Sequence, residues 1–299
     1  MERVIFASIS GVADLDRKIP ILAASVRQFA GILSDCPIWV LVPKTEKEIP
    51  EKTKTRLLAQ NVQLIPFTVD EEARKFPFAA LVRAAATVES LAKEKTELLA
   101  WMLADTIIIK EPKHLLLDAE KNLGYRPVHH TLVGSLYEEP VDAFWELVYR
   151  KCNVSEEKLF PMKTHVDGNT LRPYFNAGFL IVRPEKGLLQ AWWEAFEKLY
   201  QDPDFKAHYA KNQLYTIFIH QAVLAGVILS TMDRQELQEL PFSYNYPLHL
   251  YAESAKEYRP QNISDLITAR YENPETLEKV PLQEPLKSWV GELRNSLAA

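Results

Sequence analysis

The first 110 residues alternate short apolar runs with longer stretches of helical periodicity. The apolar runs are rich in β-branched and aromatic residues and suit buried strands, at residues 3–9, 37–43 and 62–67. Between them, residues 19–33 repeat apolar side chains at steps of three and four. The alanine-rich stretch 77–94 is amphipathic and opens on Pro77, as a helix start favours. This alternation predicts an α/β fold with a parallel sheet covered by helices.

The same pattern extends through most of the remaining chain. Further strands are expected at residues 98–112, 127–136 and 174–184, and further helices at 140–152 and 184–201. A polar loop separates the two groups up to about residue 172. We therefore expect one domain over residues 1–255 and a C-terminal extension over 256–299. Apolar side chains on one face of 285–297 predict a helix that packs on the domain; a membrane anchor or a partner-docking helix is the alternative.

Composition excludes several classes of protein. The 299 residues are 47% hydrophobic and 25% charged, as in ordinary globular chains, and the net charge of −5 argues against a nucleic-acid binder. The two cysteines, Cys36 and Cys152, form neither a disulfide framework nor a zinc pattern. No transmembrane segment is expected, since one needs roughly 18 apolar residues in a row. These features predict a cytoplasmic protein.

One acid interrupts the apolar run "LLAWMLADTIIIKEP", residues 98–112. Open α/β sheets bind ligands outside the carboxyl ends of their strands, which is where Asp105 would stand. A carboxylate there can coordinate a divalent cation that bridges a diphosphate, or it can accept a hydrogen bond from a ribose hydroxyl. It can equally cap a turn. This residue alone leaves the three uses open.

Four stretches together resemble the nucleotide-diphosphosugar transferases of the GT-A fold, especially the glycogenin-like and galactosyltransferase-like families. They are "WMLADTIIIKEP" (101–112), "YFNAGFLIVRPEKGLLQAWWEAF" (174–196), "IHQAVLAGVI" (219–228) and "LPFSYNY" (240–246). In those families the corresponding segments are an acidic motif at a strand end, a strand that enters a helix, a helix start and a later strand. Their order and spacing agree with the family, and the resemblance covers roughly residues 3 to 250.

The resemblance implies a single GT-A domain with a mostly parallel central sheet flanked by helices, followed by a C-terminal helical tail. It implies a UDP- or GDP-sugar donor and a hydroxyl acceptor. The catalytic candidates carried over from it are Asp105, Asn176, His220 and Gln221. The substrate-binding candidates are Ser8, Ile9 and Ser10 after the first strand, Arg83, Leu103, Ala104, Ala177, Gly178, Tyr244, Asn245 and Arg270.

The chain also departs from the family pattern at the metal site. That site uses two aspartates separated by one residue, but the first of these positions is Leu103 here. His220 occupies the position before Gln221 where the family usually has an acid. A late-strand histidine is the third ligand in many relatives, whereas "LITARYEN" offers Arg270 and Tyr271. Asp105 is therefore the one candidate ligand for Mn²⁺ or Mg²⁺, in an incomplete set.

Two hypotheses follow from these departures. In the first, the chain is a glycosyltransferase in which Arg83 and Arg270 offset the charge of the leaving diphosphate in place of a metal. In the second, it has lost catalysis and acts as a nucleotide-sugar-binding module or as a partner subunit. A nucleotidyltransferase of the same fold would need a glycine-rich loop with Arg and Lys after the first strand, and "ASISGVADLDRKIP" has no such loop.

Overall fold

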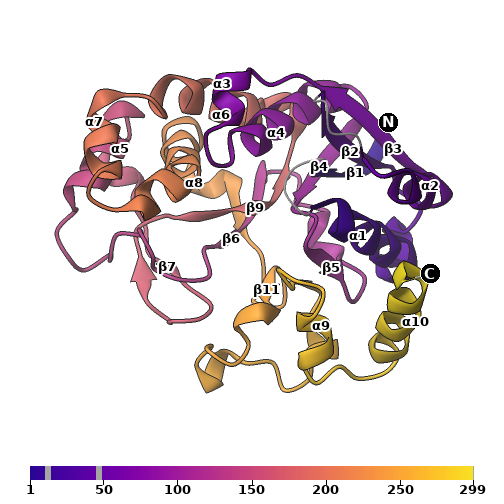
Figure 1. Ribbon diagram of the computed structural model, residues 1–299. Coiled ribbons are helices and arrows are strands. Elements are labelled where there is room, and N and C mark those ends of the chain that lie inside the picture. Colours follow the sequence, from indigo (N-terminus) through magenta and orange to yellow (C-terminus); the bar gives the residue numbers. More distant parts are fainter. Residues whose placement is uncertain (11–14, 45–48, 299) are drawn as a thin grey trace.

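A computed structural model describes residues 1–10, 15–44 and 49–298, with side-chain environments up to residue 293. Within these residues the main sheet has seven strands in the order β10-β6-β9-β4-β1-β2-β3 (Figure 1). Their bounds are β1 Glu2–Ile9, β2 Ile38–Pro43, β3 Val62–Phe67, β4 Thr96–Met102, β6 Leu123–Pro127, β9 Phe175–Val182 and β10 Leu237–Glu239. All neighbouring pairs are parallel except those of β9, which runs antiparallel to β4 and β6. The predicted α/β class with a mostly parallel sheet is confirmed.

Helices cover both faces of this sheet (Figure 1). Because successive strand residues point to opposite faces, Val4 and Phe6 of β1 pack in one core with α1 (Leu15–Phe29) and α2 (Glu51–Ala59). Ile5 and Ala7 pack in the other core. That second core includes α4 (Ala79–Ala92), α5 (Ala143–Lys151), α6 (Leu188–Leu199) and α8 (Gln213–Thr231). The short helices α3 (Glu71–Arg74) and α7 (Pro203–Tyr209) flank this face. Both faces of β1 are therefore buried, as its unbroken apolar run predicts.

The strand predicted over residues 98–112 is in fact two strands in two sheets. β4 ends at Met102, and a tight turn follows in which Thr106 N donates to Leu103 O at 3.0 Å. β5 (Thr106–Ile108) then leaves the main sheet and pairs antiparallel with β12 (Thr268–Arg270), which also pairs with β11 (Tyr246–Pro247). The prediction of one continuous strand is wrong because the turn at 103–105 redirects the chain, and the apolar pattern alone does not reveal it.

Four other predicted elements differ from the structure. β6 occupies 123–127, so most of the strand predicted at 127–136 is loop, held by the Trp145 indole N–H donating to Val133 O at 2.6 Å. The predicted polar loop contains the hairpin β7 (Met162–Lys163) and β8 (Thr170–Leu171). In "LPFSYNY" only the final residue enters a strand, and α8 begins at Gln213, so His220 lies within the helix and not at its start.

Helix α8 bears on the expectation that no segment spans a membrane. Among the described residues it is the one helix whose length, 19 residues, and mean hydropathy, 1.6, would allow a span. However, 61% of the apolar window is buried inside the fold. A core helix of a globular domain has this combination of properties.

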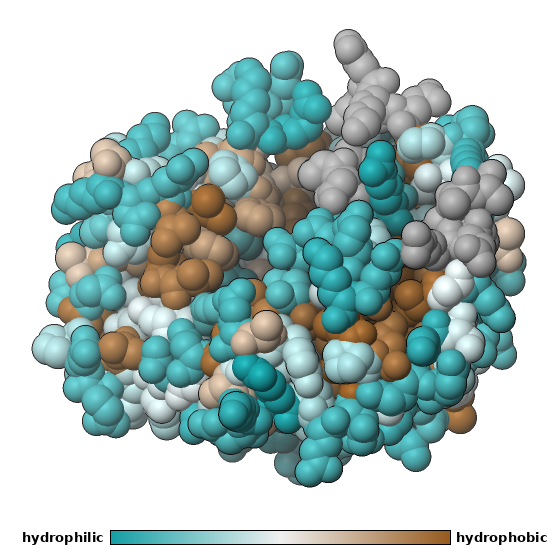
Figure 2. Space-filling model, turned by 60° about the horizontal axis from the view of Figure 1, so that its bottom comes forward, coloured by the Kyte–Doolittle hydropathy of each residue, from teal (hydrophilic) through white to brown (hydrophobic). Residues whose placement is uncertain are grey.

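The C-terminal segment packs on α1 and β5. A third core joins Ile21 of α1 and Ile107 of β5 to Leu277 of α9 (Thr276–Lys279) and Leu286 of α10 (Leu286–Ala298). Figure 1 shows α10 lying beside α1, where the rings of Trp289 and Phe29 meet edge to face at 5.2 Å. On the face shown in Figure 2 hydrophilic residues predominate and hydrophobic residues gather in a few patches.

Candidate active site

The order of the strands reverses at the carboxyl ends of β1 and β4. From β1 the chain moves to β2 and β3 on one side, then returns to form β4 on the other side of β1. Such a reversal is the topological switch point at which open α/β sheets bind ligands. Ser8 and Ser10 lie at the end of β1, and Asp105 lies three residues beyond the end of β4. The predicted residues of these two segments therefore flank the switch point.

Asp105 forms a bidentate ion pair with Arg270. Arg270 Nε donates to Oδ1 at 3.0 Å and Nη2 donates to Oδ2 at 2.6 Å. The pair is largely buried, with side-chain exposures of 6% for Asp105 and 18% for Arg270. Sheet pairing fixes this arrangement, since Arg270 is in register with Thr106, and Tyr271 N donates to the Asp105 carbonyl at 3.1 Å. The structure thus brings together two predicted residues that are 165 positions apart.

Gly178 and Leu103 lie against this ion pair. Leu103 N donates to Gly178 O at 2.9 Å, which joins the end of β4 to β9. A Cβ atom added to Gly178 would lie 2.7 Å from Leu103 Cδ1 and 3.1 Å from Arg270 Nη1. The missing side chain therefore leaves the room that the leucine and the guanidinium occupy. Ala104, between Leu103 and Asp105, is fully buried.

Asn176, Ala177 and Gln221 are joined by hydrogen bonds at the start of β9. Asn176 Oδ1 accepts from Gly178 N at 3.0 Å, and Gln221 Oε1 accepts from Ala177 N at 3.0 Å. Gln221 reaches β9 from α8, so it fixes the distance between the helix and the strand. In both side chains the amide oxygen makes these bonds, and the NH₂ group takes no part in them. The structure therefore brings these three candidate residues together, while their catalytic and binding roles remain predictions.

Two histidines outside the four stretches that resemble the family lie near this cluster. His129 Nε2 is 3.4 Å from Asn176 Nδ2 and donates to Asn245 O at 3.0 Å, which puts the ring proton on Nε2. Burial, together with the nearby His165, Arg270 and His249, lowers the pKa of His129 well below its usual range. Burial also lowers the pKa of His249, whose Nδ1 lies 3.3 Å from the Arg270 carbonyl oxygen.

Burial therefore favours the neutral form of both rings, and both lie near Arg270. The sequence offered a hint of this in the pair His129-His130 after β6, but nothing in the sequence pairs His249 with Arg270.

Asn245 and Tyr244 have different surroundings. Asn245 adopts a left-handed backbone with φ of 53°, which asparagine tolerates better than most residues. Its side-chain amide is buried and has no hydrogen-bond partner among the described residues. The Tyr244 hydroxyl instead accepts from His114 N at 3.0 Å. Asn245 thus retains free hydrogen-bonding capacity near the cluster, whereas Tyr244 is tied to the segment after β5.

The predicted nucleotide loop lies partly inside the strand. Ser8 and Ile9 belong to β1 and are buried, so they do not form a loop after it. The Ser8 hydroxyl has no partner within the described part of the chain, and the Ser10 hydroxyl donates to Asp16 Oδ1 at 2.6 Å. The expectation of a loop over 8–10 is therefore wrong for the first two residues.

Arg83 and His220 contact other parts of the fold. The Arg83 guanidinium lies 5.3 Å from the centre of the Trp193 ring, and its Nε is 3.5 Å from Thr68 O. His220 stacks on Phe78 with ring centres 4.3 Å apart, and burial lowers the pKa of its imidazole to about 4. A neutral imidazole carries no negative charge, so it does not replace the family's carboxylate electrostatically. The proposed roles of both residues remain predictions.

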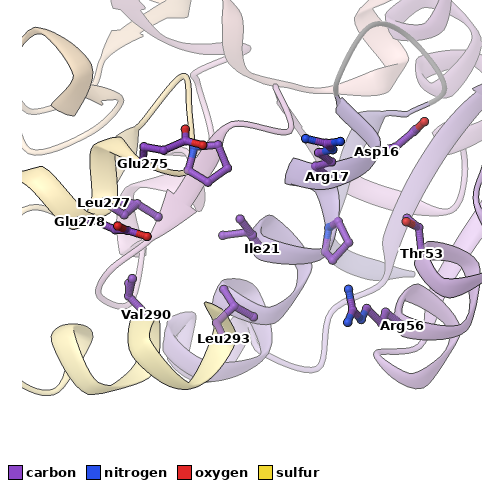
Figure 3. A pocket seen from close by; sticks show the side chains of 12 residues that line it. Asp16, Arg17, Ile21, Thr53, Arg56, Glu275, Leu277, Glu278, Val290 and Leu293 are labelled. Atoms are coloured by element: carbon purple, nitrogen blue, oxygen red, sulfur yellow. The ribbon is translucent and has the colours of Figure 1, made fainter. Parts of the chain in front are cut away.

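A separate cavity of about 630 Å³ lies between α1, α2, α9 and α10. Figure 3 shows Arg17 and Arg56 on one side of it and Glu275 and Glu278 on the other. Ile21, Leu277, Val290 and Leu293 contribute to its lining. None of the predicted donor residues lines this cavity. The candidate site around Asp105 is therefore distinct from it.

Three solved structures that are similar to this chain are of LgtC and GlyE. An active-site mutant of LgtC superposes on the chain with a TM-score of 0.51 at 14% identity, covering 99% of this chain and 96% of that one. The galactosyltransferase LgtC in complex with donor and acceptor sugar analogs has a TM-score of 0.49 at 15% identity, covering 99% of this chain and 95% of that one. GlyE of Streptococcus pneumoniae TIGR4 has a TM-score of 0.48 at 15% identity, covering 100% of this chain and 62% of that one. Of these, the first similarity supports the fold: the chain has the GT-A glycosyltransferase fold.

The family assignment comes from sequence. The family model for the Rhodobacterales glycosyltransferase domain matches residues 9–231 of the 299, which includes Asp105, Asn176 and Gln221. The chain belongs to this glycosyltransferase family. A comparison with curated proteins gives no match. Arg270 lies outside the matched segment.

Proposed function

We propose that this protein transfers a sugar from a nucleotide-diphosphosugar to a hydroxyl acceptor, and that the donor binds at the carboxyl ends of β1 and β4. The observation that carries this proposal is the place of Asp105. Its carboxylate lies just after β4 at the topological switch point, where it holds Arg270 beside Gly178 of β9. Membership of a glycosyltransferase family supports the reaction class.

In the proposed reaction the bond between the anomeric carbon and the diphosphate oxygen breaks, and the diphosphate departs with the electron pair. The acceptor oxygen forms the new bond to the anomeric carbon and loses its proton. Negative charge grows on the diphosphate as it leaves, so a fixed positive group nearby lowers the barrier. Arg270 is the cation that the structure brings to Asp105.

The neighbouring residues have separate roles in this proposal. The NH₂ groups of Asn176 and Gln221 would donate to sugar hydroxyls. Asp105 would hold Arg270 in a single orientation, because a bidentate pair restricts the guanidinium plane. The buried Ser8 hydroxyl and Asn245 amide, which no described residue satisfies, would bond to donor atoms.

Calorimetric titration of the whole chain with UDP, GDP and their sugars, followed by an assay of donor turnover, tests this proposal. We expect the sugar derivative of one of these nucleotides to bind, and the nucleoside diphosphate to be released from it when an acceptor is supplied. Binding without any turnover over a panel of acceptors would favour a non-catalytic binding module. No binding to any of these nucleotides would refute the proposed donor class.

A further inference from the structure

The family to which the GT-A resemblance points holds a divalent cation, and the residues of this chain do not fit one. Two carboxylates and a histidine form that site, whereas Leu103 and Arg270 stand at two of these three places. Both oxygens of Asp105 already accept hydrogen bonds from the guanidinium. Among the residues that the structure describes, no group of three or more His, Cys, Asp or Glu side chains is arranged to hold a metal ion. Hard cations such as Mg²⁺ need several oxygen ligands.

The two replacements match each other in charge. The formal charges of two aspartates and a divalent cation sum to zero, and so do those of one aspartate and one guanidinium. If Leu103 were an aspartate, the site would hold a second carboxylate with no cation to balance it, and burying an unpaired charge is unfavourable. Leucine removes that charge, and its side chain fills the space beside Gly178. The loss of one acid and the arrival of one arginine are therefore a matched pair of changes.

We propose that the guanidinium of Arg270 takes the place of the metal ion, so that the donor diphosphate binds to the Asp105–Arg270 pair without a divalent cation. This inference rests on the function proposed above. Of the five N–H donors of a guanidinium, Asp105 takes two, through Nε and Nη2, which leaves three. None of the described residues accepts from these three, and the side chain keeps 18% of its surface exposed. A planar fork of this kind suits bidentate contact with phosphate oxygens.

The position of the fork is set by the fold and not by the ligand. Arg270 is in register with Thr106 in the small sheet, and Nη1 lies beside Gly178. Leu103 borders the same spot and keeps one side apolar. A cation held in advance in such surroundings interacts with an anion more strongly than the same cation in water.

The experiment measures UDP and GDP binding to the whole chain by calorimetry, once with EDTA and once with MnCl₂. We expect the same affinity in both conditions. Arg270→Gln should weaken binding by about 10- to 150-fold, as expected for losing charge-assisted hydrogen bonds. The nucleotide affinity of Arg270→Lys, which keeps the charge but not the planar fork of donors, should lie between those of Arg270→Gln and the unmodified chain.

Controls separate binding from folding. Asp105→Asn combined with Arg270→Gln removes both charges, so it leaves no unpaired ion to disturb the fold, and it should also bind weakly. Arg183→Gln is the matched arginine control. Arg183 directly follows β9, at the end of that strand opposite to Asn176, and it donates to the carbonyl oxygens of Lys121 and Asp118. It should bind nucleotide as the unmodified chain does.

Three outcomes would overturn the inference. Nucleotide binding that requires Mn²⁺ would do so while leaving the proposed function standing, as would undiminished binding by a folded Arg270→Gln variant. Mn²⁺-dependent binding gained by Leu103→Asp alone would show that the metal and Arg270 do not share one place. Failure of every nucleotide to bind in either condition would instead remove the proposed function itself.

Discussion

The Asp105–Arg270 pair should dominate the stability of the small sheet, and a double-mutant cycle can measure its contribution. The pair is bidentate and nearly buried. Removing one member of a buried pair leaves the other charge uncompensated, at about 3–5 kcal/mol. Because Arg270 retains some exposure, we expect about 3 kcal/mol for each of Asp105→Asn and Arg270→Gln. The double variant carries no stranded charge, so it should lose about 2 kcal/mol less than the sum of the two.

Thermal unfolding followed by circular dichroism gives the readout. For 299 residues, the entropy of unfolding is about 0.6 kcal/mol/K near 60 °C. Each single variant should therefore lower Tm by about 5 °C. Asp105→Asn combined with Arg183→Gln is the control, because Arg183 bonds to carbonyl oxygens and not to Asp105. That pair should be additive.

Strict additivity for Asp105→Asn and Arg270→Gln would refute the reasoning. It would mean that the two side chains do not interact in the folded protein, whatever their separation. A coupling of the same size in the Arg183 control would equally show that the effect comes from the charge change and not from contact.

Three further predictions concern individual residues. Gly178→Ala should destabilise the chain by about 1–3 kcal/mol and weaken nucleotide binding, since its Cβ would lie 2.7 Å from a Leu103 methyl carbon; Gly291→Ala in α10, with nothing within 4 Å, should not lower Tm. Asn245→Ala should destabilise by about 1–2 kcal/mol through its left-handed backbone, whereas Asn245→Gly should keep Tm and alter only donor affinity. Burial raises the pKa of Glu89 from 4.5 to about 7, so the unfolded chain releases this proton first and stability falls as pH rises between these values, by on the order of 3 kcal/mol. Glu89→Gln should flatten that part of a Tm-versus-pH curve, and an unchanged slope would contradict the assignment.

The sequence was a good guide to the regular elements. β1, β2 and β9 lie where unbroken apolar runs predicted them, because a strand buried on both faces needs such a run, and the edge strand β3 lies where a shorter, partly polar run predicted it. The predicted strand at 127–136 failed because its residues are held by side-chain bonds such as that of Trp145, which no local pattern encodes. The strand at 98–112 failed in a more informative way. Its pattern is continuous, but the turn at Asp105 moves β5 into another sheet.

The site was only partly readable from the chain. The motif order placed Asp105, Asn176 and Gln221 among the candidates, and the fold brings the Gln221 side chain from α8 to the start of β9, where Asn176 lies. The place of His129 and His249 beside Arg270 could not be predicted, since it depends on neighbours that are distant in sequence. Periodicity reports which face a residue occupies, and it does not report which charged group comes to lie opposite.

By itself, the sequence determined the α/β layering, the glycosyltransferase class and the solitary acid after the fourth apolar run. It did so because strand periodicity, helix periodicity and short motifs are local properties of the chain. Only the tertiary structure decided what accompanies that acid. The pairing of β12 with β5 brings Arg270 to Asp105 across 165 positions, and beside a glycine that leaves room for both Leu103 and the guanidinium. A contact of that sequence separation depends on the register between two strands, which the fold as a whole sets.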